Sequence, residues 1–178
     1  MPITGPGWSR DAGEIFRAYR VDGRGHDTIE VPAVQLVLQQ EFHLNLSMSA
    51  AAQITRMFDK ERTGRLNETS FRKLCDFLVR CRANFDYFDQ NPKDGTLNSS
   101  EVRQALAHNG IALEPPVLAR CFETFDPNQS GSLCLPEFVV FSVFLEECRA
   151  TFAAFDPDRT GTITLDLQQF MFAGANLR

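Results

Sequence analysis

The residues best suited to chemistry are oxygen-bearing side chains at alternate positions of one short segment. Residues 126–137 read DPNQSGSLCLPE, in which five positions offer an oxygen ligand: Asp126, Asn128, Ser130, the Ser132 carbonyl and Glu137. Ca²⁺ takes about six to eight oxygen ligands, so a short segment that supplies them must wrap around the ion. Gly131 at position 6 permits the sharp turn because it has no Cβ. The segment therefore predicts a calcium-binding loop.

This spacing is that of the twelve-residue EF-hand loop. Glu137 at position 12 would supply two oxygens and open the exit helix, while Leu133 at position 8 would point towards a partner loop. Cys134 at position 9 is imperfect, since a thiol is a poor partner for a bridging water. The alternative interpretation is a surface turn that happens to fit the pattern.

Four further segments carry a related signal, an Asp followed by a loop and one apolar residue. The first Asp residues of the five loops follow one another at intervals of 37, 30, 37 and 30 residues. The resulting loops are 22–33, 59–70, 89–101, 126–137 and 156–169, and we number them one to five.

Loop three reads DQNPKDGTLNSSE and is one residue too long for the pattern. If Pro92 and Lys93 bulge outward, its oxygens could still converge on an ion. The candidate ligands are Asp89, Asn91, Asp94, the Thr96 carbonyl and Glu101. An empty loop kept for its shape explains the segment equally well.

Loop five keeps the early positions but loses the last carboxylate. Its candidate ligands are Asp156, Asp158, Thr160 and Thr162. Position 12 is Leu167, and Gln169 precedes Phe170 as Glu137 precedes Phe138. A neutral amide cannot bind bidentately, so we expect weak calcium binding or Mg²⁺ in this loop.

Loops one and two are expected to hold no metal. Loop two has Ser70 in place of the bidentate carboxylate, and three basic residues (Lys60, Arg62 and Arg65) surround it. Loop one has His26 at position 5, Asp27 in place of glycine and Ala33 at position 12.

The spacing also predicts the topology of an all-α protein with about eight helices in five helix–loop–helix units. Residues 71–88 and 138–155 contain neither Gly nor Pro, so each is expected to form one continuous helix. Loops two and three then lie at opposite ends of one helix, and so do loops four and five. The 37-residue steps leave room for a turn, near residues 45–49 and at Asn109-Gly110.

Loops one and two can therefore pair, and so can loops three and four. The predicted bridges join Ile29 to Leu66 and Leu97 to Leu133. Ile163 of loop five has no partner within the chain. Because an unpaired hand exposes its edge and a Phe-rich face, we expect a dimer through residues 138–178.

Bulk composition narrows the function classes. The 178 residues are 43% hydrophobic, with a net charge of −5 and a pI near 5.2, which argues against a nucleic-acid surface. The five cysteines are odd in number and are expected to be reduced in the cytoplasm. The three histidines are scattered away from activating partners, so catalysis is not expected. Residues 1–11 are expected to form a short flexible tail.

Three segments, RMFDKERTG, FDYFDQNPKDGTLNSSEVRQAL and FAAFDPDRTGTIT, resemble the penta-EF-hand family. The resemblance covers about residues 12–178. It implies an all-helical calcium sensor that dimerises through its fifth hand, and that binds Pro-rich or hydrophobic peptides or moves to membranes when calcium rises. The chain departs from the family's closest type, in which hands one and three bind calcium strongly, since its complete loop is in hand four.

The leading hypothesis is a non-enzymatic calcium-responsive adaptor. Calcium would expose an apolar groove for a partner peptide, with peripheral membrane association. The first alternative is a regulatory, small-subunit-like partner of a calpain-type cysteine protease, joined to it as a heterodimer of penta-EF-hand chains. The second is a structural protein whose fold calcium merely stabilises.

Overall fold

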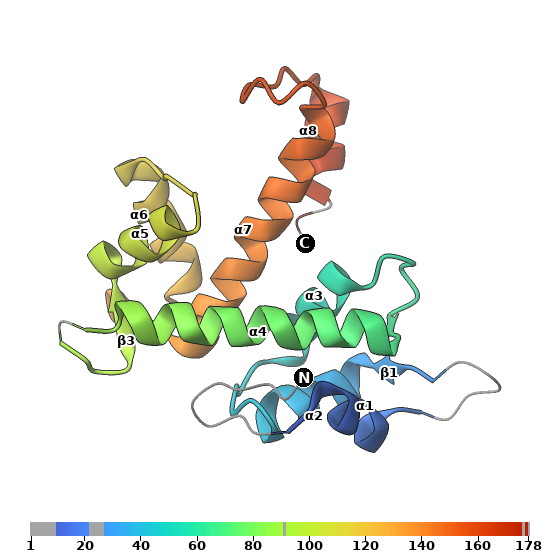
Figure 1. Ribbon diagram of the computed structural model, residues 1–178. Coiled ribbons are helices and arrows are strands. Elements are labelled where there is room, and N and C mark those ends of the chain that lie inside the picture. The colour runs from blue at the N-terminus through green and yellow to red at the C-terminus, as the bar shows by residue number, and fades with distance from the viewer. Residues whose placement is uncertain (1–9, 22–26, 91, 176, 178) are drawn as a thin grey trace.

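The structure, a computed structural model, describes residues 10–21, 27–90, 92–175 and 177, and is all-helical apart from two short antiparallel ladders. These residues form eight helices, as predicted (Figure 1). Most of the predicted tail and the centre of loop one, residues 1–9 and 22–26, lie outside the described residues, as does Asn91. None of the described helices is long and apolar enough to cross a membrane.

The first two hands form one pair, as the spacing predicts. Their loops meet in an antiparallel ladder in which Ile29 faces Leu66 and Glu30 faces Arg65. An ion pair of 2.7 Å between Arg65 and Glu30 spans the ladder. The elements are α1 (Ala12–Tyr19), β1 (Ile29–Glu30), α2 (Val31–Gln40), α3 (Met48–Phe58), β2 (Arg65–Leu66) and α4 (Glu68–Phe88).

Hands three and four form the second pair, and Leu97 faces Leu133 as predicted. Both leucines are fully buried. The turn between the two hands is made by Gly110, whose φ of 73° is left-handed, and by the prolines that start α6. The elements are β3 (Thr96–Asn98), α5 (Ser99–His108), α6 (Pro115–Phe125), β4 (Ser132–Cys134) and α7 (Leu135–Phe155).

The two predicted continuous helices, α4 and α7, each have 21 residues and a length of about 32 Å. Figure 1 shows α4 running across the molecule and α7 rising from it towards α8. Each helix leaves one loop and enters the next, which separates loop two from three and loop four from five.

Two hydrophobic clusters form the core, one for each pair. The first gathers α1–α4 around Phe16 and Phe71, whose ring centroids are 5.8 Å apart. The second gathers α5–α7 and the end of α4 around Phe138. Its ring centroid lies 5.8 Å from that of Phe85 on α4. α7 contributes to both clusters, since Val139 and Val143 belong to the first and Phe138 to the second. This helix therefore mechanically connects the pairs.

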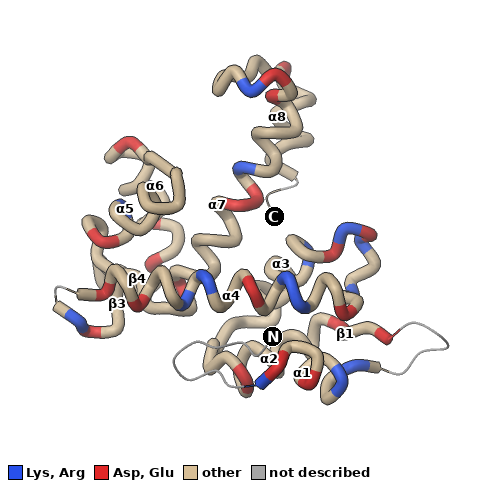
Figure 2. The backbone as a smooth tube through the Cα atoms, viewed as in Figure 1, with Lys and Arg blue, Asp and Glu red and all other residues tan. Residues whose placement is uncertain are grey.

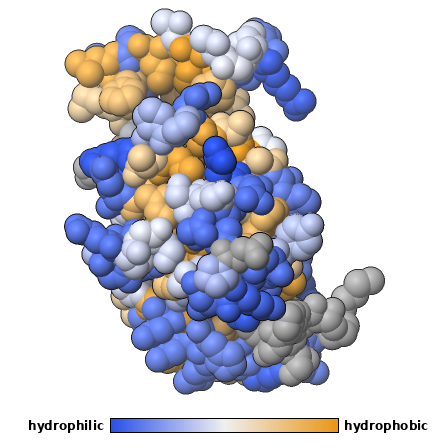
Figure 3. Space-filling view, turned by 90° about the vertical axis from the view of Figure 1, so that its left-hand side faces the viewer, coloured by the Kyte–Doolittle hydropathy of each residue, from blue (hydrophilic) through white to orange (hydrophobic). Residues whose placement is uncertain are grey.

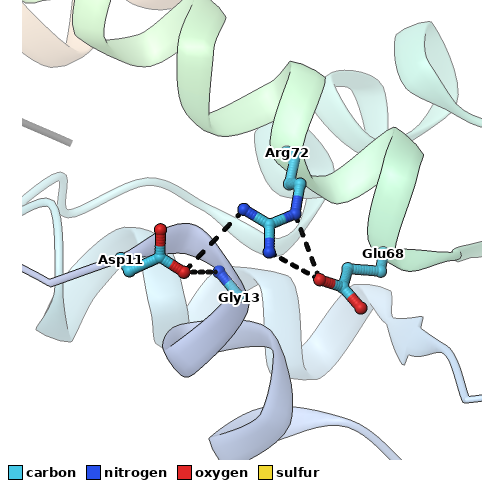
Figure 4. Close-up of polar contacts among 4 residues, drawn as sticks. All are labelled: Asp11, Gly13, Glu68 and Arg72. Atoms are coloured by element: carbon cyan, nitrogen blue, oxygen red, sulfur yellow. Dashed lines mark hydrogen bonds and ion pairs between the residues drawn. The ribbon is translucent and has the colours of Figure 1, made fainter. Parts of the chain in front are cut away.

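A charged clamp fastens α1 to α4 (Figure 4). Asp11 caps α1 by accepting a hydrogen bond of 2.8 Å from the Gly13 N–H. Arg72 of α4 lies 3.8 Å from the same Asp11 oxygen and binds Glu68 at 2.6 Å. A Cβ on Gly13 would lie 2.2 Å from the Arg72 guanidinium, so glycine makes this close approach feasible.

The fifth hand has no ladder partner among the described residues, because neither named ladder includes Ile163. Its exit helix α8 (Leu167–Ala175) returns beside the end of α7. Figure 3 shows apolar side chains gathered at this end of the molecule. The exposed fractions there are 73% for Leu167, 66% for Phe170, 64% for Met171 and 64% for Phe172.

Candidate metal centres

Loop four brings four of its five predicted ligands together. The Ser130 hydroxyl oxygen lies 3.2 Å from Asp126 Oδ1 and 2.7 Å from the Ser132 carbonyl oxygen. Asn128 Oδ1 accepts a hydrogen bond of 2.9 Å from the Ser130 N–H. The oxygens of positions 1, 3, 5 and 7 thus share one small network inside the loop.

Backbone geometry explains why these oxygens converge. Gln129 and Gly131 both have left-handed φ values, of 55° and 79°, which curl the chain around Asp126. The N–H groups of Ser130 and Gly131 then point at the Asp126 carboxylate, at 3.0 and 2.7 Å. Burial works against ionisation of Asp126, but these N–H groups and the Ser130 hydroxyl outweigh it and lower the pKa of the carboxyl. The loop therefore favours a negative charge at its first position.

Glu137, the fifth predicted ligand, lies at the third residue of α7. Its Oε2 accepts a hydrogen bond of 2.8 Å from the Cys134 N–H, so the carboxylate caps the helix. The structure places it at the edge of loop four, where it stabilises the start of α7.

The third residue of the exit helix, which is Glu137 in loop four, varies among the other loops. It is Glu101 in loop three, where Oε2 accepts a hydrogen bond of 3.0 Å from the Asn98 N–H. It is Gln169 in loop five, which exchanges hydrogen bonds of 3.0 and 2.8 Å with Asp166. It is Ser70 in loop two, whose N–H binds Asn67. Gln169 thus has the place relative to its helix that Glu137 has, which agrees with the two-residue extension expected for loop five.

Loop three accommodates its additional residue before Gly95. Asp89 Oδ2 accepts a hydrogen bond of 3.0 Å from the Gly95 N–H, although six residues separate them instead of five. The Asp94 carboxylate accepts hydrogen bonds from the N–H and hydroxyl of Thr96, at 2.9 and 2.7 Å. The Ser130 hydroxyl of loop four likewise accepts a hydrogen bond from the Ser132 N–H. Asp94 therefore has the place in loop three that Ser130 has in loop four, and the extra length lies between Asp89 and Asp94.

Loop five closely repeats the inner network of loop four. Thr160 Oγ1 lies 3.0 Å from Asp156 Oδ1 and 2.9 Å from the Thr162 carbonyl. The N–H groups of Gly161 and Thr160 lower the pKa of Asp156. Asp158 is exposed in the same loop.

Loop two shows that this network does not require a metal-binding sequence. Its Asp59 accepts a hydrogen bond of 2.6 Å from the Gly64 N–H and contacts Thr63 at 3.3 Å. Yet basic residues follow it between α3 and β2 (Figure 2), and Ser70 replaces the last carboxylate. The loop shape is thus common, and the residue types decide which loop can hold an ion.

Loop four has the donor set that fits Ca²⁺. Its candidate donors are all oxygens, they include the carboxylates of Asp126 and Glu137, and no Lys or Arg lies within residues 126–137. No group of three His, Cys, Asp or Glu side chains in the described part of the chain could hold a metal ion. Calcium coordination in loop four would therefore depend on hydroxyl, amide and carbonyl oxygens as well as on carboxylates.

Sequence reasoning missed a cleft of about 800 Å³ between α3 and the end of α7 and α8. Its lining combines apolar and charged side chains, among them Thr55, Arg56, Glu147, Thr151, Phe155 and Phe172. No clear signal in the sequence marks it, because Glu147 is only one of four charged residues in α7.

Comparison with known proteins finds relatives of one kind. The chain is 25% identical over 167 residues to peflin from Danio rerio, which covers 93% of this chain and 61% of that protein. It is 27% identical over 124 residues to a penta-EF-hand domain-containing protein from Dictyostelium discoideum, covering 70% and 60%. A homologue of programmed cell death 6 protein from Leishmania major superposes with a TM-score of 0.70 at 29% identity, covering 95% of both chains.

The chain is similar in sequence and in fold to proteins of the penta-EF-hand family. No protein-family model matches this sequence. The chain spans about three-fifths of the length of the first curated relatives it matches. Calpain small subunit 1 from Homo sapiens is a further relative, 26% identical over 115 residues and covering 65% of this chain and 42% of that one. The EF-hand proteins that it resembles generally bind Ca²⁺.

Proposed function

We propose that this protein is a non-enzymatic calcium sensor and adaptor whose principal site is loop four. The observation that carries the proposal is the position of Glu137 on α7. Glu137 is both the last oxygen ligand of loop four and a cap of the helix that packs into both hydrophobic clusters. A change at this one carboxylate can therefore reach both EF-hand pairs.

The residues of loop four perform the sensing. Bound calcium would supply the positive charge that offsets repulsion between Asp126 and Glu137. Asp126 is already held as an anion by backbone N–H groups, so it is prepared to bind. To bind the ion, Glu137 must give up the hydrogen bond that it accepts from the Cys134 N–H and turn towards the loop. This change alters the start of α7. Loop three is a second candidate through Asp89 and Glu101, and loop five would bind calcium or Mg²⁺ only weakly.

The fifth hand would provide the dimer interface, through residues 138–178. The fourth residue of the exit helix supports this proposal. In hands two and four it is Phe71 or Phe138, with exposed fractions of 0% and 1%, but in hand five it is Phe170, which is 66% exposed. The same side chain is thus core in two hands and unburied in the third. A second copy, or the fifth hand of another penta-EF-hand chain, would cover it.

The cleft between α3 and α7 is the proposed groove for a calcium-dependent partner peptide. Phe155 and Phe172 give it apolar walls, and Arg56 and Glu147 can fix a peptide's orientation. We place this activity in the cytoplasm, with recruitment to membrane-associated partners when calcium rises. No role with nucleic acid is proposed.

Calorimetric calcium titration of wild type and Glu137→Gln tests the sensor. We expect wild type to bind calcium and the variant to lose at least tenfold in affinity at the strongest site, since a neutral amide cannot replace a bidentate carboxylate. Ser70→Ala, at the same helix position of loop two, is the matched control and should leave the titration unchanged. Equal affinities for wild type and Glu137→Gln would reject loop four as the principal site.

A second candidate is the regulatory partner of a calpain-type protease, because human calpain small subunits are among the relatives. Purification of the endogenous protein discriminates between the two. A protease in stoichiometric amount would favour the regulatory subunit. If calcium raised the melting temperature without increasing dye or peptide binding, a structural role would be favoured instead.

A further inference from the structure

Glu147 is a buried carboxylate in the middle of an apolar helix. Only 8% of the residue is exposed, and its neighbours Val143 and Leu145 on α7 are buried in the core. Glu147 Oε2 accepts a hydrogen bond of 3.0 Å from Gln53 Nε2, and Oε1 lies 3.2 Å from an Arg56 guanidinium nitrogen. Both oxygens of this carboxylate are therefore bound by side chains of α3.

The two partners lie on one face of α3, since residues three apart on a helix are neighbours. α3 is the helix that enters loop two, and α7 is the helix that leaves loop four. The contact thus joins residues 91 and 94 positions apart in the sequence and fastens the first EF-hand pair to the second. α3 and α7 therefore meet at Glu147, although 91 or more positions separate the residues in contact.

Moving α7 relative to α3 disturbs this contact. If the helices separate without carrying Glu147 into water, a buried carboxylate loses its partners, which is strongly unfavourable. The contact therefore favours the arrangement seen in the structure. Arg56 and Glu147 also line the cleft, so the same contact holds two of its walls together.

We propose that Gln53, Arg56 and Glu147 form a latch between the two EF-hand pairs, which restrains α7 and sets the calcium concentration at which the cleft opens. The calcium part rests on the function proposed above. The restraint itself rests only on the contacts of Glu147. Opening the latch removes part of the cost of the conformational change, so calcium binds more tightly when the latch is absent.

The first test compares calcium titrations of Arg56→Gln, Glu147→Gln and the double variant by calorimetry. Arg56 has a side chain that is 43% exposed, so its substitution leaves the core intact. We expect each single variant to lower the calcium midpoint about fivefold, and the double variant to equal Glu147→Gln because Arg56 acts through that residue. Arg120→Gln is the control, since Arg120 pairs with Glu123 on the exposed surface of α6.

The second test uses hydrogen exchange without calcium, so that it does not depend on loop four. Amides of α3 and of α7 near Glu147 should exchange several-fold faster in Arg56→Gln than in wild type, while Arg120→Gln leaves them unchanged. If wild type binds no calcium, the proposed function fails, but the hydrogen-exchange rates still test whether the Glu147 contacts restrain α7. Unchanged exchange in Arg56→Gln overturns the latch, even if Glu147→Gln fails to fold. Faster exchange with an unchanged calcium midpoint overturns its role in setting the calcium response.

Discussion

Replacing Phe170 by serine should dissociate the proposed dimer without unfolding the protomer. Phe170 lies on α8 and is 66% exposed, so the protomer's own core loses little when the ring is removed. A second copy that covers α8 would bury this exposed part. The substitution therefore separates assembly from folding.

The magnitude follows from the exposed fraction. Complete burial of a phenylalanine side chain stabilises by about 2 kcal/mol. The exposed two-thirds of Phe170 then contributes roughly 1.3 kcal/mol in each protomer. A two-fold dimer contains two copies, so the variant should lose roughly 2.6 kcal/mol, a ~70-fold rise in the dissociation constant.

Sedimentation velocity across a range of protein concentrations, with and without calcium, measures this change. Tyr87→Ser is the matched control, because Tyr87 is 67% exposed on α4, away from the fifth hand. It should leave the dissociation constant at the wild-type value. A wild-type protein that stays monomeric at micromolar concentration in both conditions would refute the dimer. A Phe170→Ser dimer as tight as wild type would show that the interface lies elsewhere.

Three further predictions concern stability and reactivity. Leu133→Ala should lower the free energy of unfolding by about 2–5 kcal/mol in urea titrations, because Leu133 is fully buried in the ladder; a loss below about 1 kcal/mol would contradict this. The Gly13 N–H and Arg72 lower the pKa of Asp11 from 3.8, so its contribution exists above that pH and is lost as the pH falls through the lowered pKa. The difference between the melting temperatures of wild type and Asp11→Ala should accordingly be full at pH 7 and shrink as the pH falls below 3.8, and a constant difference would count against the clamp. Burial raises the pKa of Cys75 and, to about 12, that of Cys81, so a thiol reagent at pH 8 should label both only after unfolding. Rapid labelling of either thiol in the native protein would contradict their burial.

Local chemistry made much of the fold predictable. The absence of Gly and Pro between loops two and three predicts α4 as one helix, and the same holds for α7 between loops four and five. The residue at position 8 predicts the ladder partners, because the EF-hand loop always turns that residue towards its neighbour. Both bridges, from Ile29 to Leu66 and from Leu97 to Leu133, are present in the structure.

The candidate site was only partly predictable. The donors of loop four, from Asp126 to Glu137, could be read from residue types at fixed spacing. Whether these donors meet in space could not be predicted from the sequence, because Glu137 has two competing roles, as a ligand and as a helix cap. In loop three the sequence left open which of Asp89 and Asp94 keeps its place relative to Gly95, and the structure shows that Asp89 accepts a hydrogen bond from the Gly95 N–H while Asp94 accepts one from the Thr96 N–H.

Residue types and spacing alone were enough to predict the five loops and the pairing of the first four, because both depend on spacing within a few turns of helix. The order of metal-binding strength stays a prediction. Tertiary structure decided which chemically identical positions are core and which are surface. Phe138 and Phe170 are each the fourth residue of an exit helix, yet Phe138 is buried in the second cluster and Phe170 is exposed. Glu147 would pass for a surface residue, and only α3, brought beside α7 from 91 residues away, makes it a buried contact. Such properties belong to residues distant in the chain, and folding alone brings them together.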